Sequence, residues 1–308
     1  MKRFLSIGLL CVLALASCSK KDTAPDTTAP ETTIPDNTTD QEVLKKLFND
    51  IQGRWDFKAS AVLKSSAAVA RRRASHFFIK SRFIETNVQK KQSSGGFLEF
   101  LSDSTYMIYD SEENFFTGKF EVKDGTTISL KEFGSIEQIK FSDDAISFII
   151  SYGNPAKTID ISANKAAPVA TDDRTEKLCF NWLLLKEKDG RYLYDDGATF
   201  EHYNETTKEK EDLPFDKITV QFSKSGTYLV QIINKGVLQA AEVANWKWHY
   251  KDADKFVYWW DNELTQAEED EDYITIAENT DTRLELYEVY LEDDVIVEEY
   301  NLVLSRID

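Results

Sequence analysis

The chain has 308 residues, 12% of them aromatic, and its 54 acidic residues outnumber its 37 basic ones to give a formal net charge of −17 at pH 7. This length is enough for two ordinary domains. Nucleic acids and anionic lipid surfaces are themselves negative, so the charge argues against nucleic acid or a bare anionic lipid surface as a partner.

The N-terminus has the layout of a secretory signal: Lys2 and Arg3 precede a short apolar run, residues 4–16. That run falls short of the ~20 residues that span a bilayer. Leu15-Ala16-Ser17-Cys18 resembles the lipobox of bacterial lipoproteins, whose peptidase cuts before a diacylglycerol-bearing cysteine. An ordinary signal peptide with a chance cysteine is the alternative.

We therefore expect a signal peptide over residues 1–17 and a lipidated Cys18 at the start of a mature chain of 291 residues (308 − 17) with a charge of −19 (−17 − 2). Acyl chains such as palmitate would anchor this chain without a transmembrane helix. The resemblance implies a place in the bacterial cell envelope, and Ser19 after the cysteine is compatible with the outer membrane. It leaves a periplasmic or a surface-facing orientation open.

Residues 18–40 form the expected linker, because Thr23 to Thr39 consists almost wholly of Thr, Pro, Asp and Ala and cannot bury apolar surface. A helix should follow. Thr39 and Glu42 have the spacing of a capping box, and Gly53 stands where the chain should leave the helix. Five apolar residues share one face of this helix: Val43, Leu44, Leu47, Phe48 and Ile51.

Strand patterns dominate the rest of the chain. Phe120 and Val122 alternate toward a turn at Asp124-Gly125, and Ile128 and Leu130 alternate after it, which is a strong hairpin signal. Residues 282–304 alternate in the same way around Asp293-Asp294. The one basic island, Ala67 to Phe78, is either a solvated loop between strands or a contact for an acidic partner or a protease.

An internal repeat becomes visible when the chain is aligned with itself. "FLSDSTYMIY" from Phe100 matches "FSKSGTYLVQ" from Phe222, and a tryptophan lies upstream of each, Trp55 and Trp182. Two copies of one all-β domain explain this order. We place the first domain at residues 41–165, a linker at 166–174 and the second domain at 175–308.

The opening Gly53-Arg54-Trp55 after a short helix resembles the Gly-x-Trp start of lipocalin-like domains. "ITVQFSKSGTYLV", "WKW" and a late "YITIAENTDTRLELYE" are similar to lipocalin-like lipoproteins of the Bacteroidota. The resemblance implies tandem antiparallel β-barrels or barrel-like sandwiches, with an apolar-ligand cavity as one use of the fold. The second copy has Phe180-Asn181-Trp182 without the glycine, so an open variant is compatible.

The stretch from Asn245 to Asp261 is crowded with aromatic rings. Strand alternation places one set of rings on an inner face and sets Trp259 opposite Lys247 on the outer face. With a loop at residues 252–254, the predicted inner pairs are Tyr250 with Phe256, Trp248 with Tyr258, and Trp246 with Trp260.

This hairpin contains the candidate ligand or interface residues: Trp246, Trp248, Tyr258, Trp259 and Trp260. Its rings are either the core of a domain or, at the end furthest from the turn, the wall of a pocket lined by Trp246 and Trp260. Both interpretations stay open on sequence alone.

Motifs for catalysis are missing from the sequence. The three histidines, His76, His202 and His249, are scattered, and His249 should face solvent from its strand. Cys179 lies among apolar residues and is expected to be a small buried hydrophobe. The acidic run Ala267 to Tyr273 lacks the pattern of a calcium loop. We therefore expect no enzyme, no metal and no cofactor.

Two functions fit these observations. The first is a membrane-tethered, non-enzymatic binding module with another envelope protein as its partner. The alternative is a carrier of a small apolar ligand, which the family resemblance and the aromatic content suggest.

Overall fold

The computed structural model describes residues 37–63, 96–112, 114–187, 199–204, 209–259, 265, 273–292 and 295–307. The chain divides into a short N-terminal unit, Met1–Asn37, and a compact unit, Thr38–Asp308, which contains the strands given below. The predicted signal, Cys18, the tether up to residue 36 and the whole basic island lie outside the described residues. In the part that is described, no helix is both long and apolar enough to cross a membrane.

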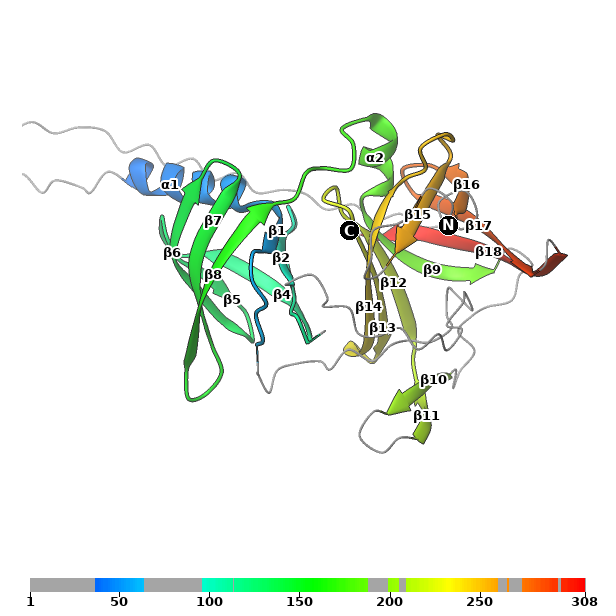
Figure 1. The fold of residues 1–308 in the computed structure, drawn as a ribbon, viewed down its shortest axis with the longest axis horizontal. Helices are drawn as coiled ribbons and strands as arrows, with labels where there is room; N and C mark the ends of the chain where they lie inside the picture. Colours follow the sequence, from blue (N-terminus) through cyan, green and yellow to red (C-terminus); the bar gives the residue numbers. More distant parts are fainter. Residues whose placement is uncertain are drawn as a thin grey trace, which may run out of the picture. The chain divides into compact units, whose positions relative to one another are not determined.

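The first sheet is a closed antiparallel barrel whose strands follow each other in chain order, with β8 returning to pair with β1 (Figure 1). Burial alternates along β7, so that Ile146, Phe148 and Ile150 point into the core. Its strands are β1 Gly53–Phe57, β2 Phe97–Phe100, β3 Thr105–Tyr109, β4 Phe115–Val122, β5 Ile128–Leu130, β6 Gly134–Ser142, β7 Ala145–Tyr152 and β8 Lys157–Lys165. The predicted Asp124-Gly125 hairpin is confirmed by the pairing of Phe120 with Leu130.

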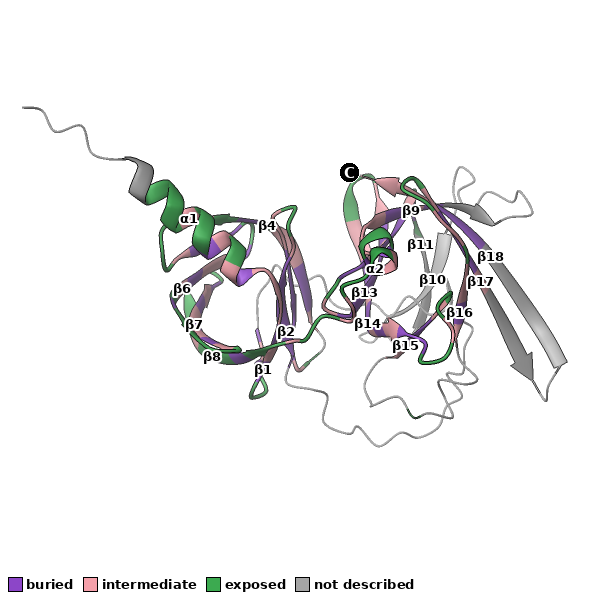
Figure 2. Ribbon diagram, turned by 90° about the horizontal axis from the view of Figure 1, so that it is seen from above, coloured by how far each residue is buried: buried purple, intermediate pink, exposed green. Residues whose placement is uncertain are grey.

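Helix α1, Asn37–Ile51, lies across one end of this barrel (Figure 1). Leu47 and Ile51 belong to the barrel core, and the ring of Phe48 stacks on that of Phe120 with centroids 5.5 Å apart. The rest of the helix surface is mostly exposed (Figure 2). The helix begins before Thr39, so the predicted capping box is wrong, while its end at Ile51 ahead of Gly53, with φ of 96°, is as predicted.

A second eight-stranded sheet also closes on itself, because β9 pairs with both β12 and β18. A separate hairpin of β10, Thr199–Asn204, and β11, Glu209–Pro214, interrupts the strand order after β9 and was not predicted. The barrel strands are β9 Asn181–Glu187, β12 Lys217–Phe222, β13 Thr227–Asn234, β14 Val237–Trp248, β15 Lys255–Trp259, β16 Ile274–Asn279, β17 Arg283–Glu292 and β18 Val295–Ile307. The fold is therefore all-β with two barrels in tandem.

A short helix, α2 Asp173–Leu178, precedes the second barrel where the sequence suggested only a linker. Asp172 caps it, since its carboxylate accepts hydrogen bonds from the backbone N–H of Thr175 at 2.9 Å and from the hydroxyl of Thr175 at 2.6 Å. A capping aspartate three residues before Thr175 was the available signal for this helix.

The two copies share one local design. Trp55 in β1 donates its indole N–H to the carbonyl of Ile51 at 2.7 Å, and Trp182 in β9 donates to the carbonyl of Leu178 at 2.9 Å. Each acceptor is the last residue of the preceding helix. In both barrels a buried tryptophan therefore fastens a helix end to the first strand.

The repeated Phe-to-Tyr segment is the same hairpin in both copies. Phe100 pairs with Tyr106 between β2 and β3, and Phe222 pairs with Tyr228 between β12 and β13. The turn residues Ser104, with φ of 64°, and Gly226, with φ of 85°, occupy equivalent positions. The internal repeat that the sequence predicted is confirmed at the level of register.

Candidate functional site

The aromatic hairpin consists of β14 and β15, and it pairs Trp248 with Phe256 and Trp246 with Tyr258. The predicted inner face is right for Trp246, Trp248 and Phe256, but the predicted pairing is two residues off. Strand β14 ends at Trp248, so residues 249–254 form the turn and Tyr250 is 46% exposed instead of facing Phe256.

The inner rings are core. Trp246, Trp248 and Phe256 are buried, and the rings of Trp246 and Trp248 meet edge to face with centroids 5.5 Å apart. The indole N–H of Trp248 donates to the hydroxyl of Thr175 at 2.8 Å, and the guanidinium of Arg174 lies 4.2 Å from the ring centroid. Packing of α2 thus completes the surroundings of Trp248.

Among the described candidate rings, Tyr258 and Trp259 lie on opposite faces of β15. Trp259 is half-buried on the outer face, where the ammonium of Lys247 lies 5.9 Å from its ring centroid, although Asn245 is its partner in register. Tyr258 is half-buried at the margin of the core. Trp260 lies outside the described residues.

His249 is buried, so the prediction of a solvated histidine is wrong. Because the strand has ended, its ring turns inward, and Nδ1 accepts hydrogen bonds from the backbone N–H groups of Lys251 at 3.2 Å and Asp252 at 3.1 Å. Its ring also meets that of Tyr273. His249 therefore organises the β14–β15 turn. His76 and the side chain of His202 lie outside the described part of the chain.

Cys179, directly after α2, packs half-buried against the second core. Burial is the main cause that raises the pKa of its thiol, so the group stays protonated and unreactive at neutral pH. Among the described residues, no three His, Cys, Asp or Glu side chains are grouped as metal ligands would be.

A hollow of about 270 Å³ opens beside β3 and β4 of the first barrel. Gly118, one of its lining residues, lets the ring of Tyr106 pack closely against β4, because a Cβ there would lie 2.9 Å from that ring. The hydroxyl of Tyr106 in turn donates to the carbonyl of Lys131 at 3.0 Å. The lining residues are Thr105, Thr117, Gly118, Lys119, Lys131 and Glu132.

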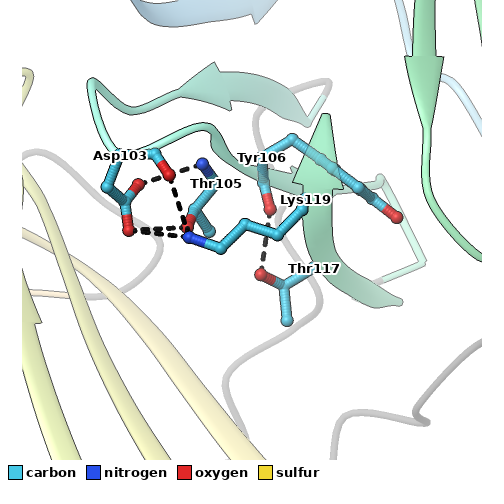
Figure 3. Close-up of polar contacts among 5 residues, drawn as sticks. All are labelled: Asp103, Thr105, Tyr106, Thr117 and Lys119. Atoms are coloured by element: carbon cyan, nitrogen blue, oxygen red, sulfur yellow. Dashed lines mark hydrogen bonds and ion pairs between the residues drawn. The ribbon is translucent and has the colours of Figure 1, made fainter. Parts of the chain in front are cut away.

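Lys119 is held in place at this hollow (Figure 3). Its ammonium donates to the carboxylate of Asp103 at 3.1 Å and to the hydroxyl of Thr105 at 2.9 Å. Partial burial acts to raise the pKa of Asp103, but hydrogen bonds from Thr105 and Lys119 outweigh it and hold that pKa below its ordinary value. The Asp103 charge thus offsets that of Lys119.

The hollow can seat a small side chain and offer it hydrogen bonds. Lys131 and Glu132 stand at its rim with side chains 72% and 83% exposed. Sequence reasoning missed this site, because it depends on the close approach of Gly118 to Tyr106 across two strands.

The class of protein that these features define is an all-β chain with tandem eight-stranded barrels. No protein-family model matches the chain, and no curated protein matches it. A solved structure of a DUF3598-family protein of unknown function from Nostoc punctiforme is similar at 11% identity, with 85% of this chain and 98% of that chain covered and a TM-score of 0.22. A mutant of transferrin binding protein B from Haemophilus parasuis is similar at 8% identity, with 70% and 53% covered and a TM-score of 0.13. With TM-scores this low, neither likeness assigns a fold family or a function.

Proposed function

We propose that the protein is a non-enzymatic lipoprotein that binds another envelope protein, with two lipocalin-like barrels anchored through Cys18. The Leu15-Ala16-Ser17-Cys18 sequence and the Thr/Pro tether behind it support the anchor. The outer membrane is the proposed site, with either a periplasmic or a surface-facing orientation.

The observation that supports the binding role is the packing of large rings inside the described part of the first barrel. Large rings occupy its interior and contact one another, as Phe133 does with Phe116 at 4.8 Å and with Tyr152 at 5.8 Å between centroids. A carrier needs vacant space inside its barrel. Rings packed in the interior favour recognition by the outer surface, where the Lys119 hollow offers a place for a partner's side chain.

The test compares partner capture by two matched charge reversals. Lys131→Glu changes the rim of the hollow, and Lys140→Glu makes the same change at an exposed site of β6 that does not line it. After cross-linking in intact cells, we expect a protein partner that is retained by the wild type and by Lys140→Glu and reduced at least several-fold with Lys131→Glu. Equal capture by all three would remove the hollow from the contact surface.

One observation favours the carrier alternative in the second barrel: Tyr258 and Ile276 pack against its core while remaining partly exposed. Organic extraction of the purified protein followed by mass spectrometry separates the two functions. An interaction module should release only its covalent acyl chains, whereas one apolar molecule per chain in the non-covalent fraction would establish the carrier function.

A further inference from the structure

The outer faces of the two barrels meet within the compact unit. Phe97, Met107, Tyr109 and Phe115 from β2, β3 and β4 form one buried cluster with residues of β13 and β14, which are Leu229, Ala241 and Val243. Residues at alternate positions of β2, Leu98 and Phe100, point instead into the first barrel. Strand alternation therefore sends Phe97 and Glu99 outward, toward the second barrel.

The contact between the two barrels buries the carboxyl group of Glu99. This side chain is 0% exposed, and neither carboxyl oxygen accepts a hydrogen bond of ordinary geometry, although three hydroxyls lie near enough to act on its pKa. In register it stands opposite Arg54 on one side and Met107 on the other. A carboxylate left unpaired in such a place is costly, whereas a protonated carboxyl is tolerated.

Three hydroxyls of the second barrel lie around this carboxyl, and each already accepts a hydrogen bond. Ser223 accepts from the backbone N–H of Thr227 at 3.0 Å, Ser225 from the backbone N–H of Arg54 at 3.2 Å, and Thr227 from the guanidinium of Arg54 at 3.4 Å. Each hydroxyl therefore keeps its own proton to donate or share.

Arg54 is not available to neutralise Glu99 fully. Its guanidinium donates to Asp56 at 2.7 Å and to Asn245 of the second barrel at 2.8 Å, and it stacks on the ring of Phe97 at 4.1 Å. Burial raises the pKa of Glu99 above the ordinary 4.5, and this outweighs the lowering by the hydroxyls of Thr227, Ser223 and Ser225 and by the charge of Arg54.

We propose that Glu99 acts as a proton-operated latch between the two barrels, closed while its carboxyl is protonated and loosened when it ionises. In the protonated form the carboxyl can donate to a neighbouring hydroxyl and accept from the others. Loss of the proton leaves a buried charge between β2 and the β12–β13 turn, which favours separation of the two faces and entry of water.

The sign of the pH effect follows from the raised pKa. Glu99 keeps its proton in the folded protein at pH values above 4.5, where the unfolded chain releases it. The latch therefore contributes its full stability to the folded state below pH 4.5, and this contribution is lost as the pH rises through the pKa of Glu99 in the folded protein. The charged groups near this carboxyl are Arg54, which acts on it through its charge, and Lys224 of the β12–β13 turn, which pairs with Glu176. Cys179, whose pKa is raised chiefly by burial and in part by the charge of Glu99, stays neutral.

The experiment follows unfolding by urea and backbone hydrogen exchange from about pH 5 to about pH 8. Glu99→Gln keeps the shape of the protonated carboxyl and cannot ionise, and exposed Glu112→Gln is the matched control. The wild type should lose stability as the pH rises, and Glu99→Gln should lose less. The difference between the two in the unfolding equilibrium constant should be tenfold for each unit by which folding raises the Glu99 pKa. Protection from exchange at β2 and at the β12–β13 turn, taken relative to the intrinsic exchange rate at each pH, should fall with rising pH in the wild type and in the control only.

A second variant covers the case in which Glu99→Gln fails to fold. Thr227→Val removes a hydroxyl that favours the ionised carboxyl, so the latch transition should move to higher pH. Parallel pH profiles of wild type and Glu99→Gln would overturn the latch. So would an unshifted transition in Thr227→Val.

Discussion

Truncation of Trp248 tests the interpretation of the aromatic hairpin as core. Its side chain is buried, meets the ring of Trp246 edge to face and holds α2 through the hydroxyl of Thr175. Aromatic-to-alanine changes in cores cost ~3–5 kcal/mol. We expect Trp248→Ala to lose about that much free energy of unfolding, and the buried Thr175 hydroxyl left without its donor places the loss toward the upper end.

Trp259 supplies the matched control on the opposite face of the same hairpin. It is half-buried, and its polar contact is the ammonium of Lys247 at 5.9 Å from the ring. Exposed cation–π contacts contribute ~0.5–1 kcal/mol, so Trp259→Ala should lose about 1 kcal/mol. Trp248→Phe, which keeps an aromatic ring but lacks the N–H, should fall between the two.

Urea unfolding followed by far-ultraviolet circular dichroism measures all three variants without relying on the fluorescence of the residue removed. Equal, small losses for Trp248→Ala and Trp259→Ala would refute the assignment of faces. A nearly unchanged stability in Trp248→Ala together with loss of a bound molecule would show that the ring lines a pocket.

Two further predictions concern the repeat. Trp55→Phe and Trp182→Phe each remove the same indole hydrogen bond to a helix end. Each should lower the free energy of unfolding by ~1–3 kcal/mol in urea, and the two losses should agree within ~1 kcal/mol. A large loss in one copy alone would contradict their equivalence. Segments 41–165 and 175–308, expressed separately, should each melt cooperatively, because each barrel closes with its own strands. Each should melt at a lower temperature than the whole protein, because separation exposes its half of the apolar cluster that contains Phe97 and Leu229. Calorimetry of the two segments decides this, and non-cooperative melting of both would indicate one interlocked structure.

Much of the fold could be predicted from local signals. The Asp124-Gly125 turn and the Phe-x₅-Tyr repeat fixed hairpins whose partners lie only a few residues away, and both are confirmed in register. The alternation of Trp246 and Trp248 fixed the faces of β14 for the same reason.

The features that the sequence did not predict correctly depend on contacts between distant segments or on turn geometry. The predicted β14–β15 pairing was two residues off. Two backbone N–H groups of the turn donate hydrogen bonds to the His249 ring, and the turn is longer than the three-residue loop that the sequence suggested. The hollow and the burial of Glu99 were not predictable, because each requires a neighbour from another strand or from the other barrel. The β10–β11 hairpin consists mostly of polar residues, so apolar alternation in the sequence did not reveal it.

Membrane fractionation of Cys18→Ser tests the central claim, a lipid-anchored module, most directly. The wild type should sediment with membranes after a carbonate wash and partition into detergent, because several acyl chains hold it there. Cys18→Ser should appear in the soluble fraction, while Cys179→Ser, which changes a half-buried cysteine of the second barrel, should remain with the membrane. Sedimentation of Cys18→Ser with washed membranes would contradict the account.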